Sequence, residues 1–188
     1  MVHYCLVVIR SINQMVFVSF LPLYFTLRGH SEVEGGRLLT LFLLTGGIAG
    51  LWGGILADRF SGRIVIVASM AGYAPMSLGF LLTEGWVSVL CCAMAGGFLL
   101  LSNPINVVMA QQLVPEASST ISSLMMGFAW GVGGFLIPLI GFFSDLMGLH
   151  TVLVGLVLIT SPGFLIAFFL PAVRMSSTAP SLASEAAL

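Results

Sequence analysis

The chain has 188 residues, of which 59% are hydrophobic and only 7% are charged, and its mean hydropathy is +1.13. Soluble domains carry about 25% charged residues, so this composition excludes a soluble domain or a disordered chain and indicates an integral membrane protein. The net charge of −1, with six arginines and no lysine, argues against nucleic-acid binding. The three cysteines lie in apolar runs without metal-ligand spacing, and we expect neither a metal nor a cofactor.

Charged and turn-forming residues divide the chain into apolar segments of membrane-spanning length. A helix needs about 20 apolar residues to cross a bilayer. We therefore predict an all-α integral membrane fold, with one bundle of six transmembrane helices over residues 1–171 and a disordered Ser/Ala/Pro-rich tail over 172–188. The helices are expected at about 2–25, 35–57, 64–83, 86–110, 120–144 and 151–170.

The arginines in the loops indicate how the bundle is oriented. An even number of helices places both termini on one side, and that side holds Arg59, Arg63 and Arg174. Arg28 and Arg37 lie on the other side and are accompanied by glutamates. Because cytoplasmic loops carry an excess of basic residues, we expect a multi-pass protein of the cell inner (plasma) membrane with both termini in the cytoplasm.

A spacing of glycines and an aspartate in the second helix recurs in the fifth. The matched residues are Gly46, Gly47, Gly54 and Asp58 in the second helix and Gly133, Gly134, Gly141 and Asp145 in the fifth. Copies three helices apart run in opposite directions through the membrane, and such inverted repeats are typical of transporters, in which they let a bundle open to either side. Chance similarity between two glycine-rich helices is the alternative.

The connection between the second and third helices carries charges at a fixed spacing. A glycine is followed four residues later by Asp-Arg, and then by Gly-Arg. The segment resembles the helix–loop–helix signature of major facilitator superfamily transporters, with Ser61 as one additional residue. The resemblance implies a gating loop that locks two six-helix halves together in one state and releases them during transport; an ordinary positively charged cytoplasmic loop is the alternative. The gating residues would be Gly54, Asp58, Arg59, Gly62 and Arg63.

Further segments extend this resemblance over nearly the whole chain, up to about Pro171. The pairs Arg10-Ser11 and Leu21-Pro22, the segment 111–115 and the glycine-rich stretch 126–134 together are similar to the second half of fosmidomycin-resistance-type drug efflux proteins. Family members have twelve helices. The resemblance therefore implies that this chain corresponds to the C-terminal six, and that a missing N-terminal half, or a partner half, completes the transporter. The proton-coupling carboxylate commonly belongs to that other half.

Polar side chains inside the apolar segments fall mainly on the first and fourth helices. An intramembrane polar group is costly and usually faces a cavity or another helix. Residues spaced i, i+3 and i+4 share a helix face, and the resemblance implies that the first and fourth helices line a central cavity. The candidate substrate-cavity residues are Arg10, Asn13, Gln14, Asn103, Asn106 and Trp130. The alternatives are that the arginine extends toward the headgroups, the amides bond between helices, and the tryptophan serves packing.

The resemblance implies a transporter rather than an enzyme: the C-terminal half of an efflux protein that exports a small drug-like or polar molecule, coupled to protons. An intramembrane serine protease would need a histidine base at mid-depth, where none of the three histidines lies. A channel with paired Asn-Pro half-helices would need a second copy of Asn103-Pro104, and the equivalent place near Phe17 has none. A self-associating six-helix bundle, or a channel-like protein without intrinsic active transport, is the remaining alternative.

Overall fold

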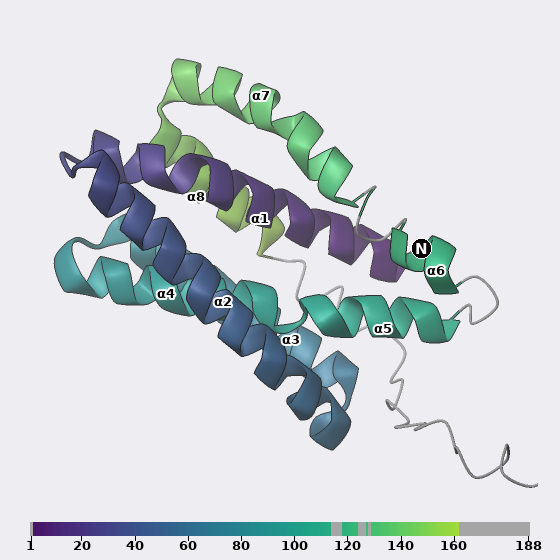
Figure 1. The fold of residues 1–188 in the computed structure, drawn as a ribbon. Helices are drawn as coiled ribbons and strands as arrows, with labels where there is room; N and C mark the ends of the chain where they lie inside the picture. The colour runs from purple at the N-terminus through teal and green to yellow at the C-terminus, as the bar shows by residue number, and fades with distance from the viewer. Residues whose placement is uncertain (1, 114–117, 124–126, 128, 162–188) are drawn as a thin grey trace, which may run out of the picture.

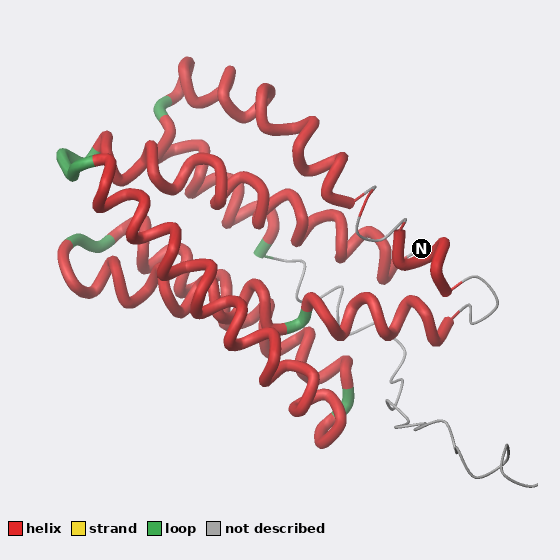
Figure 2. Tube along the Cα trace, in the orientation of Figure 1, coloured by secondary structure: helices red, strands yellow, loops and turns green. Residues whose placement is uncertain are grey.

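The structure is a computed structural model, and it describes residues 2–113, 118–123, 127 and 129–161. Every regular element in these residues is a helix, and the connections that the structure describes are short (Figures 1 and 2). In chain order the helices are α1 (Val2–Leu27), α2 (Glu32–Phe60), α3 (Gly62–Leu82), α4 (Gly85–Leu101), α5 (Asn103–Leu113), α6 (Ser118–Ser123), α7 (Ala129–Met147) and α8 (Leu149–Thr160).

Within the described residues, five helical segments are long and apolar enough to cross a membrane. They comprise α1, α2, α3, the stretch that joins α4 to α5, and α7, whereas the apolar helix α8 is shorter as far as it is described. The all-helical, multi-span architecture agrees with the prediction. One predicted span, 86–110, is interrupted at Ser102. The predicted span 120–144 covers the end of α6 and most of α7, and residues 124–126 and 128 within it lie outside the described residues. The end of the sixth predicted helix and the tail 172–188 lie outside the described residues.

Helix α1 lies at the centre of the arrangement. It contacts α2, α7 and α8, while α4 packs against both α2 and α3 (Figure 1). The main core forms where these helices meet, and aromatic rings fill much of it. The ring of Phe17 on α1 lies 6.2 Å from the ring of Phe42 on α2 and 5.9 Å from that of Tyr73 on α3, measured between centroids. These contacts fix α1 against both neighbours.

Small residues bring α2 and α4 close together. A Cβ atom at Gly46 would overlap the side chain of Leu100, and one at Gly96 would overlap the carbonyl oxygen of Phe42. A Cβ at Gly53 would overlap the carbonyl oxygen of Leu101. Small-residue faces of this kind let transmembrane backbones approach each other. The α2–α4 contact therefore depends on glycines.

The end of α1 and the start of α2 are set by local signals. Gly29 has a positive φ of 90°, a conformation that glycine adopts without strain, and it follows the last turn of α1. Helix α2 begins with a capping box: the backbone N–H of Ser31 donates to Glu34 Oε2 at 2.8 Å, and the Glu34 N–H donates to Ser31 Oγ at 3.3 Å. These bonds satisfy amide groups that the first turn leaves without helical partners.

Helices α4 and α5 are two parts of one broken span. Pro104 has no N–H to donate to the carbonyl of Leu100, and the regular helix is interrupted at Ser102. The helix then resumes, with the Asn106 N–H donating to the Ser102 carbonyl at 3.0 Å. A break at membrane depth leaves carbonyl groups that need donors from elsewhere in the protein. The guanidinium of Arg10 donates a hydrogen bond to a carbonyl in the last turn of α4, that of Leu99.

Candidate functional site

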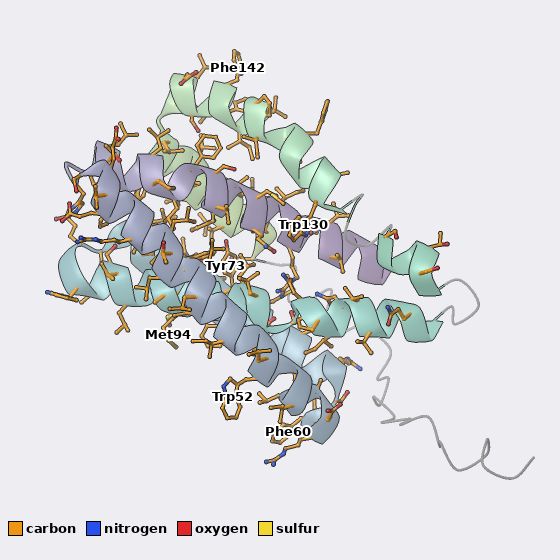
Figure 3. All side chains as sticks on the ribbon, viewed as in Figure 1. Trp52, Phe60, Tyr73, Met94, Trp130 and Phe142 are labelled. Atoms are coloured by element: carbon orange, nitrogen blue, oxygen red, sulfur yellow. The ribbon has the colours of Figure 1, made fainter. Side chains whose placement is uncertain are left out.

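A cavity of about 490 Å³ lies between α1, α5 and the first residues of α7, and we call it the α1–α5 cavity. Its lining comprises Val7, Arg10, Ser11, Asn103, Pro104, Asn106, Val107, Val108, Gln111 and Trp130. Four of the six predicted cavity residues are in this set. Figure 3 shows Trp130 at the start of α7, beside α1. The cavity therefore lies toward the end of the bundle at which α1 begins.

Of the described residues that line the cavity, Arg10 is the only charged one, and it is 4% exposed. Its Nη1 donates to Ser69 Oγ on α3 at 2.9 Å, and its Nη2 donates to the Leu99 carbonyl. Both acceptors are electrically neutral. The guanidinium therefore links α1 to α3 and to the broken span, and the headgroup-directed orientation considered from sequence does not describe it.

The hydroxyl of Ser69 is fully engaged around this arginine. It donates to the Ile66 carbonyl at 2.9 Å, accepts from Arg10, and lies 3.0 Å from the hydroxyl of Ser102. Because its single proton goes to Ile66, Ser102 is the donor of the last bond. This cluster holds the break between α4 and α5 against α3, at the back of the α1–α5 cavity.

Asn13 does not line the cavity. Its Oδ1 accepts hydrogen bonds from the hydroxyls of Tyr73 on α3 and Thr160 on α8, each at 3.2 Å, and its Nδ2 donates to the Ile9 carbonyl at 3.0 Å. Asn13 therefore joins three helices inside the bundle. In this structure Asn13 forms hydrogen bonds between helices, which was the alternative to lining the cavity.

Gln14 is also absent from the cavity lining, but it supports a residue that is present. Its Oε1 accepts from Asn103 Nδ2 at 3.1 Å. This bond joins α1 to the first residue of α5 and orients the Asn103 amide, whose other face borders the α1–α5 cavity.

The prediction from sequence omitted several lining residues, among them Ser11, Pro104 and Gln111. Two of these carry a usable signal. Ser11 directly follows Arg10, and Gln111 lies eight residues after Asn103, a spacing that returns to the same face of a helix. The supporting serines on α3 and at the helix break carry no such signal, because a hydroxyl in a transmembrane helix commonly bonds to its own backbone.

The hydrogen bonds of Asn13 give a testable prediction. Replacing Asn13 with alanine and Tyr73 with phenylalanine, singly and together, should reveal a coupling free energy of about 0.6 kcal/mol, the average for such bonds between membrane helices. The measurement is the free energy of unfolding in detergent micelles. Strictly additive effects would show that the Asn13–Tyr73 bond contributes nothing to the stability of the bundle.

The predicted gating loop is compact in the structure. Helix α2 ends at Phe60, α3 begins at Gly62, and Ser61 alone connects them. Asp58 and Arg59 are exposed and Arg63 is half-buried. Within the part of the chain that the structure describes, the only ion-pair contact joins His30 to Glu34, so the charges of this loop are not paired with each other. Ser61, the one residue by which this segment is longer than the superfamily signature, therefore forms the entire α2–α3 connection.

Ser61 has a φ of 114°, which side-chain-bearing residues rarely adopt, and its Oγ is buried without a hydrogen-bond partner among the described atoms. We expect Ser61→Gly to raise the free energy of unfolding by about 1 kcal/mol, because glycine relieves the backbone strain. Ser61→Ala is the matched control: it removes the unpartnered hydroxyl and keeps the strain. Thermal unfolding in micelles measures both, and a lower midpoint for the glycine variant would contradict the prediction.

Comparison with known proteins places this chain in a family. The family model of the Major Facilitator Superfamily matches residues 2–138. The chain belongs to the major facilitator superfamily. As a superfamily member with several apolar helices, it is a multi-pass membrane protein.

Two curated superfamily relatives match similar lengths of the chain. The MFS-type transporter YfnC of Bacillus subtilis (strain 168) is 35% identical over 131 residues, which cover 70% of this chain and 32% of the relative. The fosmidomycin resistance protein of Escherichia coli (strain K12) is 29% identical over 130 residues, covering 68% of this chain and 32% of the relative. The matched region is thus about a third of the length of these superfamily transporters.

A solved superfamily structure shows the same fold. The crystal structure of the major facilitator transporter FucP in the outward conformation aligns with a TM-score of 0.73 and 21% identity, over 89% of this chain and 42% of that chain. The chain therefore has the fold of half of a major facilitator transporter. The resemblance drawn from the sequence motifs is confirmed at the level of the superfamily.

Proposed function

We propose that the chain acts as the C-terminal half of a major facilitator efflux transporter, which exports a small drug-like or polar molecule across the cell inner membrane. The observation that carries this proposal is the α1–α5 cavity. Polar side chains from α1 and α5 converge on it, although they are far apart in sequence and surrounded by apolar residues. Few, well-placed polar groups in a largely apolar wall are typical of small-molecule sites.

A second six-helix half is part of this proposal. Alternating access needs two bundles that rock about a shared site near the middle of the membrane. Helices α2 and α7 both pack on α1, yet only 22% of an apolar 18-residue stretch of α2 and 6% of that of α7 are buried within the described chain. We propose that the second half covers these apolar faces and closes the α1–α5 cavity, with the bilayer around the assembly.

Export and proton coupling rest on different supports. Export is favoured by the 29% identity to the fosmidomycin resistance protein. For proton coupling, the five acidic residues in the described part of the chain are all exposed, at or beside helix ends. We therefore assign the coupling carboxylate to the second half. Separately, because cytoplasmic loops carry an excess of basic residues, we propose that both termini and the α2–α3 connection lie on the cytoplasmic side.

A chimera tests this proposal. In it, the chain replaces the C-terminal half of the Escherichia coli fosmidomycin resistance protein, and the readout is the fosmidomycin concentration that stops growth of a strain lacking that protein. We expect the chimera to confer resistance, and the chain alone to confer none. The relative without its C-terminal half serves as the negative control, with membrane insertion checked by immunoblot.

Two outcomes would contradict the proposal. A chimera that inserts into the membrane but gives no resistance would show that the chain does not act as an efflux half. Equal resistance from the chain alone would show that copies of this chain transport by self-association, the alternative that its exposed α2 and α7 faces leave open.

A further inference from the structure

We propose that the α1–α5 cavity binds a small organic anion through the guanidinium of Arg10. This inference rests on the proposed transport function and names the class of its substrate. The first support is the sign of the charge. Of the described residues that line the cavity, Arg10 alone is charged; the others are hydroxyl, amide, indole and aliphatic groups. A ligand in this cavity therefore meets a positive charge and no carboxylate of this chain.

The second support is the missing counter-charge. The acidic residues that the structure describes are Glu32, Glu34, Asp58, Glu84 and Asp145. Every one is exposed and lies at or beside a helix end, whereas Arg10 is 4% exposed. Buried charges in proteins are normally paired, because an unpaired one loses its hydration without compensation. Arg10 is buried against the neutral oxygens of Ser69 and Leu99 instead, so a bound anion would supply the pairing.

The third support is the unused hydrogen-bonding capacity of the guanidinium. It has five N–H donors arranged in a planar fork. One Nη1 hydrogen goes to Ser69 and one Nη2 hydrogen goes to Leu99, and the buried Nε has no hydrogen-bond partner among the described atoms. Carboxylates and phosphonates match this fork with two parallel hydrogen bonds, which are stronger than bonds to neutral acceptors. The two existing bonds hold the guanidinium in place for such a ligand.

The rest of the lining indicates what the anion carries. Trp130 is 44% exposed and forms part of the wall, and Val7, Val107 and Val108 contribute aliphatic surface. Asn103 and Ser11 add neutral polar groups. The cavity volume of about 490 Å³ is within the range of small-molecule sites. The ligand class is therefore an amphiphilic anion, with a carboxylate or phosphonate group on an aromatic or aliphatic body.

Fluorescence of Trp130 tests the inference directly. Trp52 and Trp86, both exposed and outside the cavity lining, are replaced with phenylalanine, so that Trp130 is the only indole in the full chain. The purified chain in micelles is titrated with benzoate, phenylphosphonate, neutral benzamide and cationic benzylamine. We expect saturable changes with the two anions, binding of benzamide that is weaker by roughly tenfold to a hundredfold, and no change with benzylamine.

Variants separate the charge of Arg10 from its structural bonds. Arg10→Gln should abolish the preference for benzoate over benzamide, and Arg10→Lys should retain it. Ser69→Ala removes one acceptor of Arg10 but leaves the charge, so it should also retain the preference. This variant therefore controls for the possibility that Arg10→Gln loses the preference only because the helices pack less tightly. Arg28→Gln is the matched control, because Arg28 likewise donates to backbone carbonyls, those of Phe80, Leu81 and Thr83, but lies outside the cavity.

Three results would overturn the inference. They are equal binding of benzoate and benzamide, binding of benzylamine, and the absence of saturable binding by either anion. The inference would also be overturned if the preference for benzoate over benzamide disappeared when the chain is joined to a second half. Arg10 would then pair with a carboxylate of that half rather than with a ligand. These results are independent of the resistance assay: resistance without an anion preference removes this inference alone, and an anion preference without resistance removes the efflux proposal alone.

Discussion

Replacing Arg10 with glutamine is expected to reduce efflux by roughly tenfold to a hundredfold. Removal of a charged partner from a hydrogen-bonded pair costs about 1.5–3 kcal/mol, and Arg10 provides the only charge of the described cavity lining. The measurement is the initial rate of substrate release from cells that express the chimera, taken over a range of internal substrate concentrations. We expect the concentration for half-maximal rate to rise, because a binding group has been removed.

The control for this prediction is again Arg28→Gln. The Arg28 guanidinium lies 4.9 Å from the centre of the Tyr24 ring and bonds to carbonyls at the end of α3, so its loss should lower stability and leave the half-maximal concentration unchanged. If Arg10→Gln transports normally, the polar face of α1 serves only to hold helices together. A fall in maximal rate with an unchanged half-maximal concentration would point to a defect in assembly.

The cavity illustrates how far sequence reasoning reaches in a membrane protein. Arg10, Asn103, Asn106 and Trp130 line one cavity although nothing in their spacing joins α1 to α5 and α7. The reasons available from sequence are general: an intramembrane polar group is costly, and the family resemblance names the helices that face inward. Those two arguments select helices well. They do not select individual side chains.

Asn13 and Gln14 show why individual side chains are harder to place. Adjacent residues on a helix point about 100° apart, and here these two face different neighbours although both fall within the broad polar face of α1. Gln14 bonds to Asn103 on α5, whereas Asn13 bonds to α3 and α8. The choice between them depends on where the neighbouring helices lie, which the sequence of α1 does not contain.

The break between α4 and α5 has a similar explanation. Pro22, Pro75 and Pro138 lie inside α1, α3 and α7 without dividing them, so a proline in an apolar segment does not by itself predict a break. At Pro104 a donor from another helix is present, because Arg10 bonds to the carbonyl of Leu99. That partner is remote in sequence, and for this reason the segment 86–110 reads as one continuous helix.

Gly53→Val is expected to have the largest effect on folding. A Cβ atom at Gly53 would overlap the carbonyl oxygen of Leu101, which is backbone and cannot rotate away as a side chain can. The helices α2 and α4 would have to separate at the point where the broken span turns toward the α1–α5 cavity. Overpacking of a tight core costs about 1–3 kcal/mol or more, and we place this variant at the upper end because two backbones are in contact.

The neighbouring glycine provides a matched control. A Cβ at Gly54 meets no described atom within 4 Å, so Gly54→Val makes the same chemical change on the adjacent residue without the overlap. The thermal unfolding midpoint of each variant in micelles measures the difference, and only Gly53→Val should fall sharply. The sequence motif singles out Gly54 as a gating residue, whereas the close approach of the two backbones is at Gly53. If the two variants lose equal stability, the α2–α4 contact at Leu101 is not what holds these helices together. If Gly54→Val instead loses efflux while its stability is unchanged, the result would support the predicted gating role of Gly54. In that case the open side of α2 at Gly54 would contact the second half during transport.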